Sequence, residues 1–253
     1  MIFERRRYGR DNYLYLLADG PDAALVDPAD TEVALELCRV HRVSPRWILH
    51  THGHADHVGG SSFLRAELDA VVLGHGADAA GFRPDRDLAG TSGLELGRLR
   101  LRVHPAPGHT PGSVLLEWEG TLLTGDTLFW GGCGNCRHGG DPRRLARSFL
   151  GVLAGLDDGL EVHPGHDYAE ANLPFVVDLE PLNLEALERL EQVREARRAG
   201  REPDAVPLGL ERDVNPFLRA GSPEVRAALA ARDRHPSTPE EAFVALRSLR
   251  DAW

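Results

Sequence analysis

The stretch Thr51-His52-Gly53-His54-Ala55-Asp56-His57 decides how this sequence is interpreted. It follows an apolar run directly and places three histidines and one aspartate within six residues. In extended backbone, residues two apart project to the same side, so His52 and His54 can meet on one cation. Past the bend, Asp56 and His57 reach a neighbouring position. Imidazole and carboxylate groups are common ligands of divalent metals, and the stretch therefore predicts two adjacent metal sites.

Three further candidate ligands stand where a predicted strand meets a turn. They are His109 in the Pro105–Gly112 loop, Asp126 at the end of the Leu122–Asp126 run, and His166 just after Val162–Gly165. Each of them alone is more typical of a turn residue than of a ligand. Beside the dense stretch, however, they predict the remaining ligands of the two sites.

The first two thirds of the chain read as short strands joined by turns and a few helices. Apolar or alternating runs predict strands at 23–26, 47–50, 99–103, 114–118 and 121–124. Glu119-Gly120 predicts a tight hairpin between the last two strands. A helix is expected after a cap at Asp30 or Thr31, with an apolar stripe of Val33, Leu37 and Val40.

After about residue 167 the pattern becomes helical. Leu184, Leu187, Leu190 and Val193 predict one apolar helix face, and Asn183 precedes them as a cap. Further helices are expected from about 222 to 232 and after Thr238. We therefore expect a sheet-rich catalytic domain over residues 1–167 and a helical substrate-binding subdomain over residues 168–253.

Composition excludes several classes of protein. The 253 residues carry a formal net charge of -10, which disfavours a nucleic-acid partner and a nuclease activity. The three cysteines are too few for a secreted disulfide framework, so we expect a cytoplasmic protein. No run approaches the roughly 18 apolar residues of a membrane span, and Met1–Arg7 leads into no apolar signal core. No membrane association is expected.

The motif at 51–57 resembles that of the metallo-β-lactamase superfamily, Thr-His-x-His-x-Asp-His, at every defined position. This resemblance implies an α/β fold of the αββα sandwich type, with the metals at the edge of two facing sheets. It also implies two divalent metal ions. Zinc is the simplest assignment, and iron or manganese also suits imidazole and carboxylate. By position, the first metal would bind His52, His54 and His109, the second Asp56, His57 and His166, and Asp126 would bridge them.

Over nearly its whole length the chain is similar to the glyoxalase II family within that superfamily. The matching segments are Asp11–Tyr13, Gly125–Phe129 with Gly132–Gly134, Pro164–Tyr168, Asn215–Arg219 and Leu246–Trp253. The resemblance implies that Arg247 and Arg250 anchor the carboxylates of glutathione and that Tyr168 lines its site. Arginine suits that role because its planar fork pairs with a carboxylate at two points.

One segment departs from the family pattern. After Cys133-Gly134 the family has a Lys, an aromatic residue and a Tyr, whereas this chain has Asn135, Cys136 and Arg137. Asn135 and Arg137 are therefore candidate substrate contacts. Either Arg137 supplies the missing positive charge, or the enzyme uses a thiol carrier other than glutathione.

The resemblance implies a thioester hydrolase that acts on a small molecule. Hydroxide shared by the two metals would attack S-(hydroxyacyl)glutathione, Asp56 would orient the hydroxide, and glutathione would leave as its thiolate. The alternative is a glutathione persulfide dioxygenase with one iron on His52, His109 and Asp126. The helical third argues against that alternative, and the complete ligand set argues against a non-catalytic paralogue. We expect a monomer or a small homo-oligomer.

Overall fold

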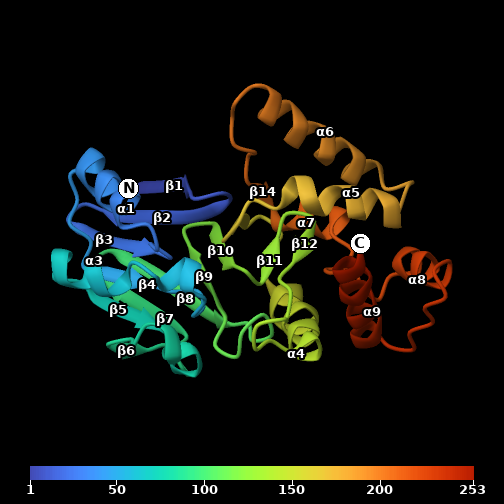
Figure 1. Cartoon of the computed structure of the whole chain (residues 1–253), viewed down its shortest axis with the longest axis horizontal. Coiled ribbons are helices and arrows are strands. Elements are labelled where there is room, and N and C mark those ends of the chain that lie inside the picture. The colour runs from blue at the N-terminus through green and yellow to red at the C-terminus, as the bar shows by residue number, and fades with distance from the viewer.

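The computed structural model describes residues 1–253, with side-chain surroundings for all of them except Gly81 and Leu96. Two six-stranded sheets face each other, and helices lie on their outer sides and at one end (Figure 1). The first sheet contains, in order, β1 (Ile2–Tyr8), β2 (Asn12–Asp19), β3 (Asp22–Val26), β4 (Trp47–Leu49), β5 (Val71–Gly74) and β6 (Arg86–Asp87).

The second sheet draws its strands from the rest of the chain. Its order is β14 (Val206–Pro207), β13 (Glu161–Pro164), β10 (Thr121–Gly125), β9 (Val114–Trp118), β8 (Leu99–Pro105) and β7 (Gly93–Leu96). Its one parallel pair is β10 with β13. A small two-stranded ribbon, β11 (Leu128–Phe129) with β12 (Gly132–Cys133), follows β10.

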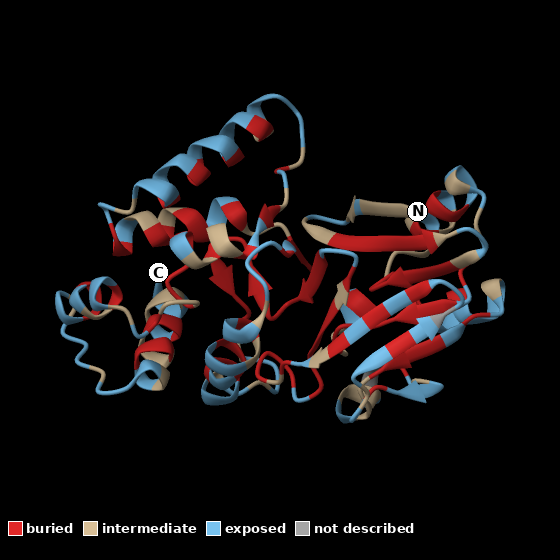
Figure 2. Ribbon diagram, turned by 180° about the vertical axis from the view of Figure 1, so that it is seen from behind, coloured by how far each residue is buried: buried red, intermediate tan, exposed pale blue. Residues whose placement is uncertain are grey.

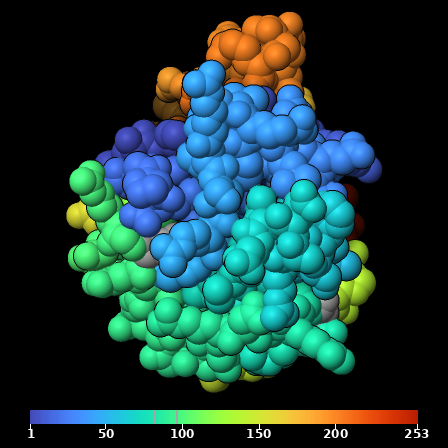
Figure 3. Space-filling model, turned by 90° about the vertical axis from the view of Figure 1, so that its left-hand side faces the viewer, coloured from blue at the N-terminus to red at the C-terminus, as the bar shows by residue number. Residues whose placement is uncertain are grey.

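Most of the helices lie in the second half of the chain. They are α1 (Thr31–His41), α2 (Ala55–Val58), α3 (Ser61–Leu68), α4 (Pro142–Arg147), α5 (Ala169–Leu179), α6 (Leu184–Arg198), α7 (Leu208–Val214), α8 (Pro223–Ala230) and α9 (Pro239–Ala252). A 3-10 turn, η1 (Gly76–Gly81), lies between β5 and β6. A π-helical turn, η2 (Ser148–Val152), and a 3-10 turn, η3 (Leu153–Gly155), follow α4. The face turned away from the helical end consists almost wholly of the first half of the chain, below a projecting α6 (Figure 3).

Alternation along β2 shows how the layers are built. Tyr13, Tyr15 and Leu17 pack between the two sheets, whereas Leu14 and the next even-numbered residues pack under α1 and α3. Because successive strand residues point to opposite faces, a strand that is apolar throughout is covered on both sides. Figure 2 shows β2 buried along most of its length. The αββα sandwich predicted from the motif is confirmed.

Local predictions for the strands also hold. Glu119 and Gly120 both have positive φ, 46° and 81°, in the two-residue turn that joins β9 to β10. That conformation matches the twist of a hairpin, and glycine adopts it freely. In β8, Leu99 is buried and Arg100 exposed, and this alternation continues along the strand as its sequence predicts.

Two predicted helix faces were wrong in part. Val40 of α1 is 61% exposed, because α1 packs on the sheet through Ala34, Leu37 and Cys38. Leu184 of α6 is 70% exposed, because the helix buries Ala186, Arg189, Leu190, Val193 and Ala196 instead. In both helices small side chains allow the close approach, so the buried face is rotated away from the most apolar one.

The predicted helix starts are confirmed. The side chains of Asp30, Asn183 and Ser222 each accept a hydrogen bond from a backbone N–H in the first turn of their helix. Thr238 forms a reciprocal capping box with Glu241 at the start of α9. Each cap typically contributes about 1 kcal/mol to helix stability.

The helical end packs directly on the second sheet. β14 pairs with β13, and Phe217 and Phe243 share one apolar core with strand residues. The division expected between residues 167 and 168 falls between β13 and α5. None of the described helices has the length and apolar character that a bilayer span requires.

Glu211 of α7 is a fully buried carboxyl group in this packing. Its Oε2 accepts hydrogen bonds from Gly131 N (3.0 Å) and Asn215 Nδ2 (3.3 Å), and among the described atoms its Oε1 has no partner. Burial raises the pKa of Glu211 from 4.5 to about 7. The raised pKa stabilises the folded state below pH 4.5, and this contribution is lost as the pH rises through 7.

We predict that Glu211→Gln removes this loss, because glutamine keeps an acceptor oxygen and cannot ionise. Between pH 5 and pH 8 the variant should gain stability relative to the wild type by up to roughly 3 kcal/mol in urea unfolding. Glu195→Gln, at an exposed position of α6, is the control. An equal pH dependence in all three proteins would contradict the prediction.

Candidate metal centre

The seven predicted ligands lie together at one edge of the two sheets. His52 and His54 occupy the turn between β4 and α2, and Asp56 and His57 belong to α2. The other three are His109 between β8 and β9, Asp126 just after β10, and His166 just after β13. Because β10 and β13 are parallel neighbours, the residues that follow them emerge at the same edge.

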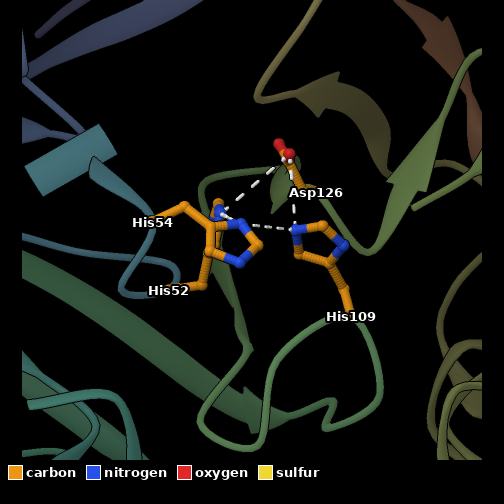
Figure 4. A group of neighbouring side chains, drawn as sticks. All are labelled: His52, His54, His109 and Asp126. Carbon is orange, nitrogen blue, oxygen red and sulfur yellow. Dashed lines mark hydrogen bonds and ion pairs between the residues drawn. The ribbon is translucent and has the colours of Figure 1, made fainter. Parts of the chain in front are cut away.

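The first ligand group consists of His52, His54, His109 and Asp126, and its ligand atoms lie within 4.8 Å of one another. His54 Nδ1 lies 3.1 Å from His52 Nε2 and 3.0 Å from His109 Nε2. Asp126 Oδ2 approaches from the opposite side, 3.5 Å from His109 Nε2 (Figure 4). All four side chains point toward one central position.

The second ligand group consists of Asp56, His57 and His166, again within 4.8 Å of one another. His57 Nε2 lies 3.1 Å from His166 Nε2, and Asp56 Oδ2 lies 3.2 Å from the same nitrogen of His166. Asp126 faces this group too, because its Oδ1 lies 3.4 Å from His57 Nε2. Its carboxylate therefore stands between the two groups.

Acceptors behind four of the histidines orient their rings. The Nδ1–H groups of His57, His109 and His166 donate to Asp27 Oδ2 (3.1 Å), Asn135 O (2.7 Å) and Asp11 Oδ1 (2.9 Å). Thr51 Oγ1 donates to Asp27, so it accepts from Nδ1 of His52. These hydrogen bonds turn each Nε2 into the cluster. Hydrogen-bond partners orient the rings of metal-bound histidines in the same way.

His54 has the opposite orientation. Its Nδ1 faces the cluster, and its Nε2 lies 3.4 Å from the backbone oxygen of His138. The loop after β12 therefore closes one side of the site.

The charges of the cluster favour a bound cation. Burial would raise the pKa of Asp126, but His57 and His166 hold it well below its usual value. Burial would lower the pKa of His166, but Asp126, Asp56 and Asp11 raise it to about 11. Burial lowers the pKa of His52 and of His109. Asp126 and Asp27 raise the pKa of His57 as well. The cluster thus holds carboxylate anions beside two protonated histidines, His57 and His166, and two neutral ones, His52 and His109, and a divalent cation would take the place of the protons.

The donor atoms fit a pair of divalent metal ions. Asp126 Oδ1 is buried and has no hydrogen-bond partner among the described atoms. Gly165 leaves room beside it, since a Cβ at Gly165 would lie 2.4 Å from that oxygen. Imidazole nitrogens and carboxylate oxygens suit zinc, iron and manganese alike. The His/Asp clusters therefore indicate a divalent metal pair.

Sequence reasoning missed Asp27, which organises the centre from behind. Its carboxylate accepts from Thr51 N (2.9 Å) and Thr51 Oγ1 (2.6 Å) and orients His57. His57 and His50 hold its pKa below the usual range although burial would raise it. Asp27 directly follows the apolar strand β3 and is buried. A charged residue at the end of an apolar run is the feature of the sequence that could have identified it.

A cavity of about 290 Å³ opens beside the second group. Its lining includes the predicted substrate residues Asn135, Arg137, Tyr168, Arg247 and Arg250, together with Phe129, Cys133, Asn172, Asp251 and Trp253. Tyr168 stacks on His166 with ring centroids 4.8 Å apart and joins the cavity to the ligands. Asn135 also touches the first group, through the backbone oxygen that accepts from His109.

The three arginines of this cavity differ in their freedom. Arg247 is buried and donates to Cys133 O (2.9 Å) and Asp251 Oδ1 (3.1 Å). Arg250 is half-buried and donates to Ala171 O (3.1 Å). The side chain of Arg137 is 62% exposed and donates to Asp251 O (3.0 Å). Arg250 and Arg137 are thus the more accessible cations, and Arg247 holds its neighbours in place.

Cys136 is a free thiol at the edge of the same loop. Burial raises its pKa to about 12, and its Sγ lies 3.4 Å from Gly108 O. A thiol with so high a pKa is a poor nucleophile at neutral pH.

Comparison with known proteins agrees with this geometry. The family model of the metallo-beta-lactamase superfamily matches residues 7–166, and that of the hydroxyacylglutathione hydrolase C-terminus matches residues 167–253. A hydroxyacylglutathione hydrolase of Anaeromyxobacter dehalogenans (strain 2CP-C) is 64% identical and covers 99% of both chains. One of Polaromonas sp. (strain JS666) is 35% identical over 100% of both chains.

Solved structures share the fold. ETHE1 from Myxococcus xanthus has a TM-score of 0.65 at 25% identity, covering 100% of this chain and 99% of its own. TTHA1623, solved in a di-iron-bound form, has a TM-score of 0.62 at 28% identity, covering 85% of this chain and 100% of its own. The chain belongs to the hydroxyacylglutathione hydrolase (glyoxalase II) family of thioester hydrolases, within the metallo-β-lactamase superfamily, as its motifs predict.

Proposed function

We propose that this enzyme hydrolyses S-(hydroxyacyl)glutathione to glutathione and a hydroxy acid. The observation that carries the proposal is a pair of neighbouring ligand groups, next to an arginine-lined cavity, in which Asp126 of the first group also faces His57 and His166 of the second. His52, His54 and His109 would hold one divalent ion, Asp56, His57 and His166 the other, and Asp126 both. Zinc is the simplest assignment for this set, with iron or manganese as alternatives.

When bound, such a metal pair polarises a carbonyl oxygen and lowers the pKa of water toward about 7. The carboxylate of Asp56, whose side chain is 52% exposed, faces outward where water can reach it. Asn12 Nδ2 donates to its Oδ2 (3.1 Å) and fixes its direction. A hydrogen bond from His166, followed by the charge of His57, lowers the pKa of Asp56. Asp56 therefore accepts a hydrogen bond from the attacking water and orients it.

The leaving group requires no dedicated acid. A thiol has a pKa near 8.5, so the thiolate departs far more readily than an alkoxide would. The water supplies the oxygen of the new carboxylic acid and the proton that returns to the thiol. Residues 168–253 would bind the carrier through Arg250, Arg247 and Tyr168, with Asn135 and Arg137 from the loop after β12.

We further propose that the enzyme works in the cytoplasm, since its three cysteines are free. A small-molecule thioester would be its partner, and the chain would act as a monomer or a small homo-oligomer.

The first test concerns Asp126. Asp126→Asn keeps the side-chain shape but removes the charge that faces both ligand groups, so both metal ions should be lost or weakened together with turnover. Metal content per chain, measured by mass spectrometry beside released thiol, checks this. Asp213→Asn, at an exposed position of α7, is the control. One metal per wild-type chain with full hydrolysis would contradict the dinuclear assignment, and one iron without hydrolysis would favour the dioxygenase.

The second test concerns Asp56. Mutation of a residue that merely supports a metal ligand typically lowers metal affinity or activity about 10- to 100-fold. Asp56→Asn is therefore expected to lower kcat at least about tenfold and to change KM much less, because Asp56 does not hold the thiol. Steady-state kinetics on a glutathione thioester decide this, and an unchanged kcat would remove the orienting role.

The third test concerns the thiol carrier. A charge-assisted hydrogen bond to a carboxylate is worth roughly 1.5–3 kcal/mol, or about one to two powers of ten in affinity. Arg250→Ala should raise KM for a glutathione thioester at least about tenfold with little change in kcat. Arg98→Ala, at an exposed position in the turn between β7 and β8, is the matched control.

The double variant Asn135→Lys/Arg137→Tyr restores the residues usual in the family. A higher kcat/KM on the glutathione thioester would indicate that the natural carrier is another thiol. A lower value would indicate that Arg137 already binds glutathione. If neither Arg250→Ala nor the double variant changes KM, the proposed glutathione site is wrong.

A further inference from the structure

Asp78 lies outside both ligand groups and contacts the two loops that carry the first one. It belongs to the short turn η1, which follows β5. One of the loops is Thr51–His54, which holds two ligand histidines, and the other is Ala106–Ser113, which holds His109. These loops come from different sheets, so their separation depends on contacts between them.

The Asp78 carboxylate binds three donors from these loops. Its Oδ2 accepts from Gly53 N (3.1 Å) and from Thr110 Oγ1 (2.5 Å), and its Oδ1 accepts from Gly112 N (2.9 Å). Gly53 stands between the two ligand histidines of its loop, and Thr110 directly follows His109. A carboxylate that bridges backbone N–H groups in this way makes charge-assisted hydrogen bonds, which are the stronger kind.

The space around this carboxylate is closed on two sides. A Cβ at Gly53 would lie 2.7 Å from Asp78 Cβ, and one at Gly112 would lie 2.8 Å from Asp78 Cγ. Both loops therefore need glycine where they meet Asp78. A further bond, from Val114 N to Thr51 O (2.9 Å), joins the same loops at the ends of their strands. Asp78 holds them at the tips, beside the ligands.

We infer that Asp78 is a positioning residue that sets the spacing between His52 and His54 on one loop and His109 on the other. The inference rests on the proposed ligand set. Asp78 would contribute to metal affinity by holding three imidazoles at one separation before any ion arrives. Without it, the ion would have to order the loops, and the free energy of that ordering would be subtracted from binding.

The test is zinc binding to the metal-free full-length protein, in competition with a chromophoric chelator. In Asp78→Ala, one of the two zinc ions is expected to bind at least about tenfold more weakly, while the other stays within a few-fold of its wild-type affinity. Asp78→Glu, which keeps the charge but shifts the oxygens, should recover little. Affinities for both ions within about twofold of wild type would overturn the inference.

Asp87→Ala is the matched control. Asp87 also accepts two backbone N–H bonds near η1, from Gly76 (2.7 Å) and Ala89 (2.8 Å), and among the described residues it makes no hydrogen bond to either ligand loop. Its loss should leave both zinc affinities unchanged. Equal weakening in Asp87→Ala and Asp78→Ala would show a general disturbance of this segment and would also overturn the inference.

Thr110→Val tests the same role if Asp78→Ala does not fold. Valine keeps the shape of the residue and leaves the two backbone bonds of Asp78 intact, so the same zinc ion should weaken, though less. Unchanged zinc affinity in Thr110→Val would overturn the inference while the ligand set stands. A wild-type protein that binds no zinc, iron or manganese would instead overturn the ligand set itself, and the inference with it.

Discussion

The buried carboxylate of Asp126 is the group on which the arrangement of this protein depends. It faces four histidine rings from the end of a central strand, and one of its oxygens has no hydrogen-bond partner among the described atoms. An ionised carboxylate without compensation would be costly to bury, so positive charge has to be present beside it. In the metal-free protein, protons on the surrounding histidines supply that charge. In the metal-bound protein, the cation would replace those protons.

The two-sheet architecture makes this concentration of ligands feasible. Four of the five ligating segments follow the end of a strand or connect two strands at one edge, so their backbones are anchored before the side chains converge. The groups behind the ligands then restrict the rings. Asp27, Asp11, Thr51 and a backbone oxygen each hold one Nδ1, and this directs Nε2 of these four rings into the cluster. Rigid orientation of this kind reduces the reorganisation that metal binding and catalysis would otherwise require.

The helical end serves the site by shaping the loop after β11. Asn215 donates to Phe129 O and Gly132 O, and Arg247 donates to Cys133 O, so helices α7 and α9 fix both strands of the small ribbon. This ribbon lines the cavity beside the metal ligands. A substrate held by the helical residues would therefore meet a cavity wall whose position the same helices determine. The apolar core that joins helices and sheet supports this coupling.

Local spacing and periodicity in the sequence by themselves determined the seven candidate ligands and most helix and strand positions, and the resemblance of its motifs to a known family implied the fold. The dense motif at 51–57, the hairpin at Glu119-Gly120 and the cap at Thr238 are all local signals. Only the tertiary structure decided which faces of α1 and α6 are buried, since small residues at close helix contacts outweigh the most apolar stripe. It also brought Asp27, Asp11 and Asp78 to the ligands from distant segments. The position of Asp27 at the end of an apolar strand marks it as a candidate. The contacts of the three carboxylates, however, arise from long-range packing and have no spacing signature along the chain.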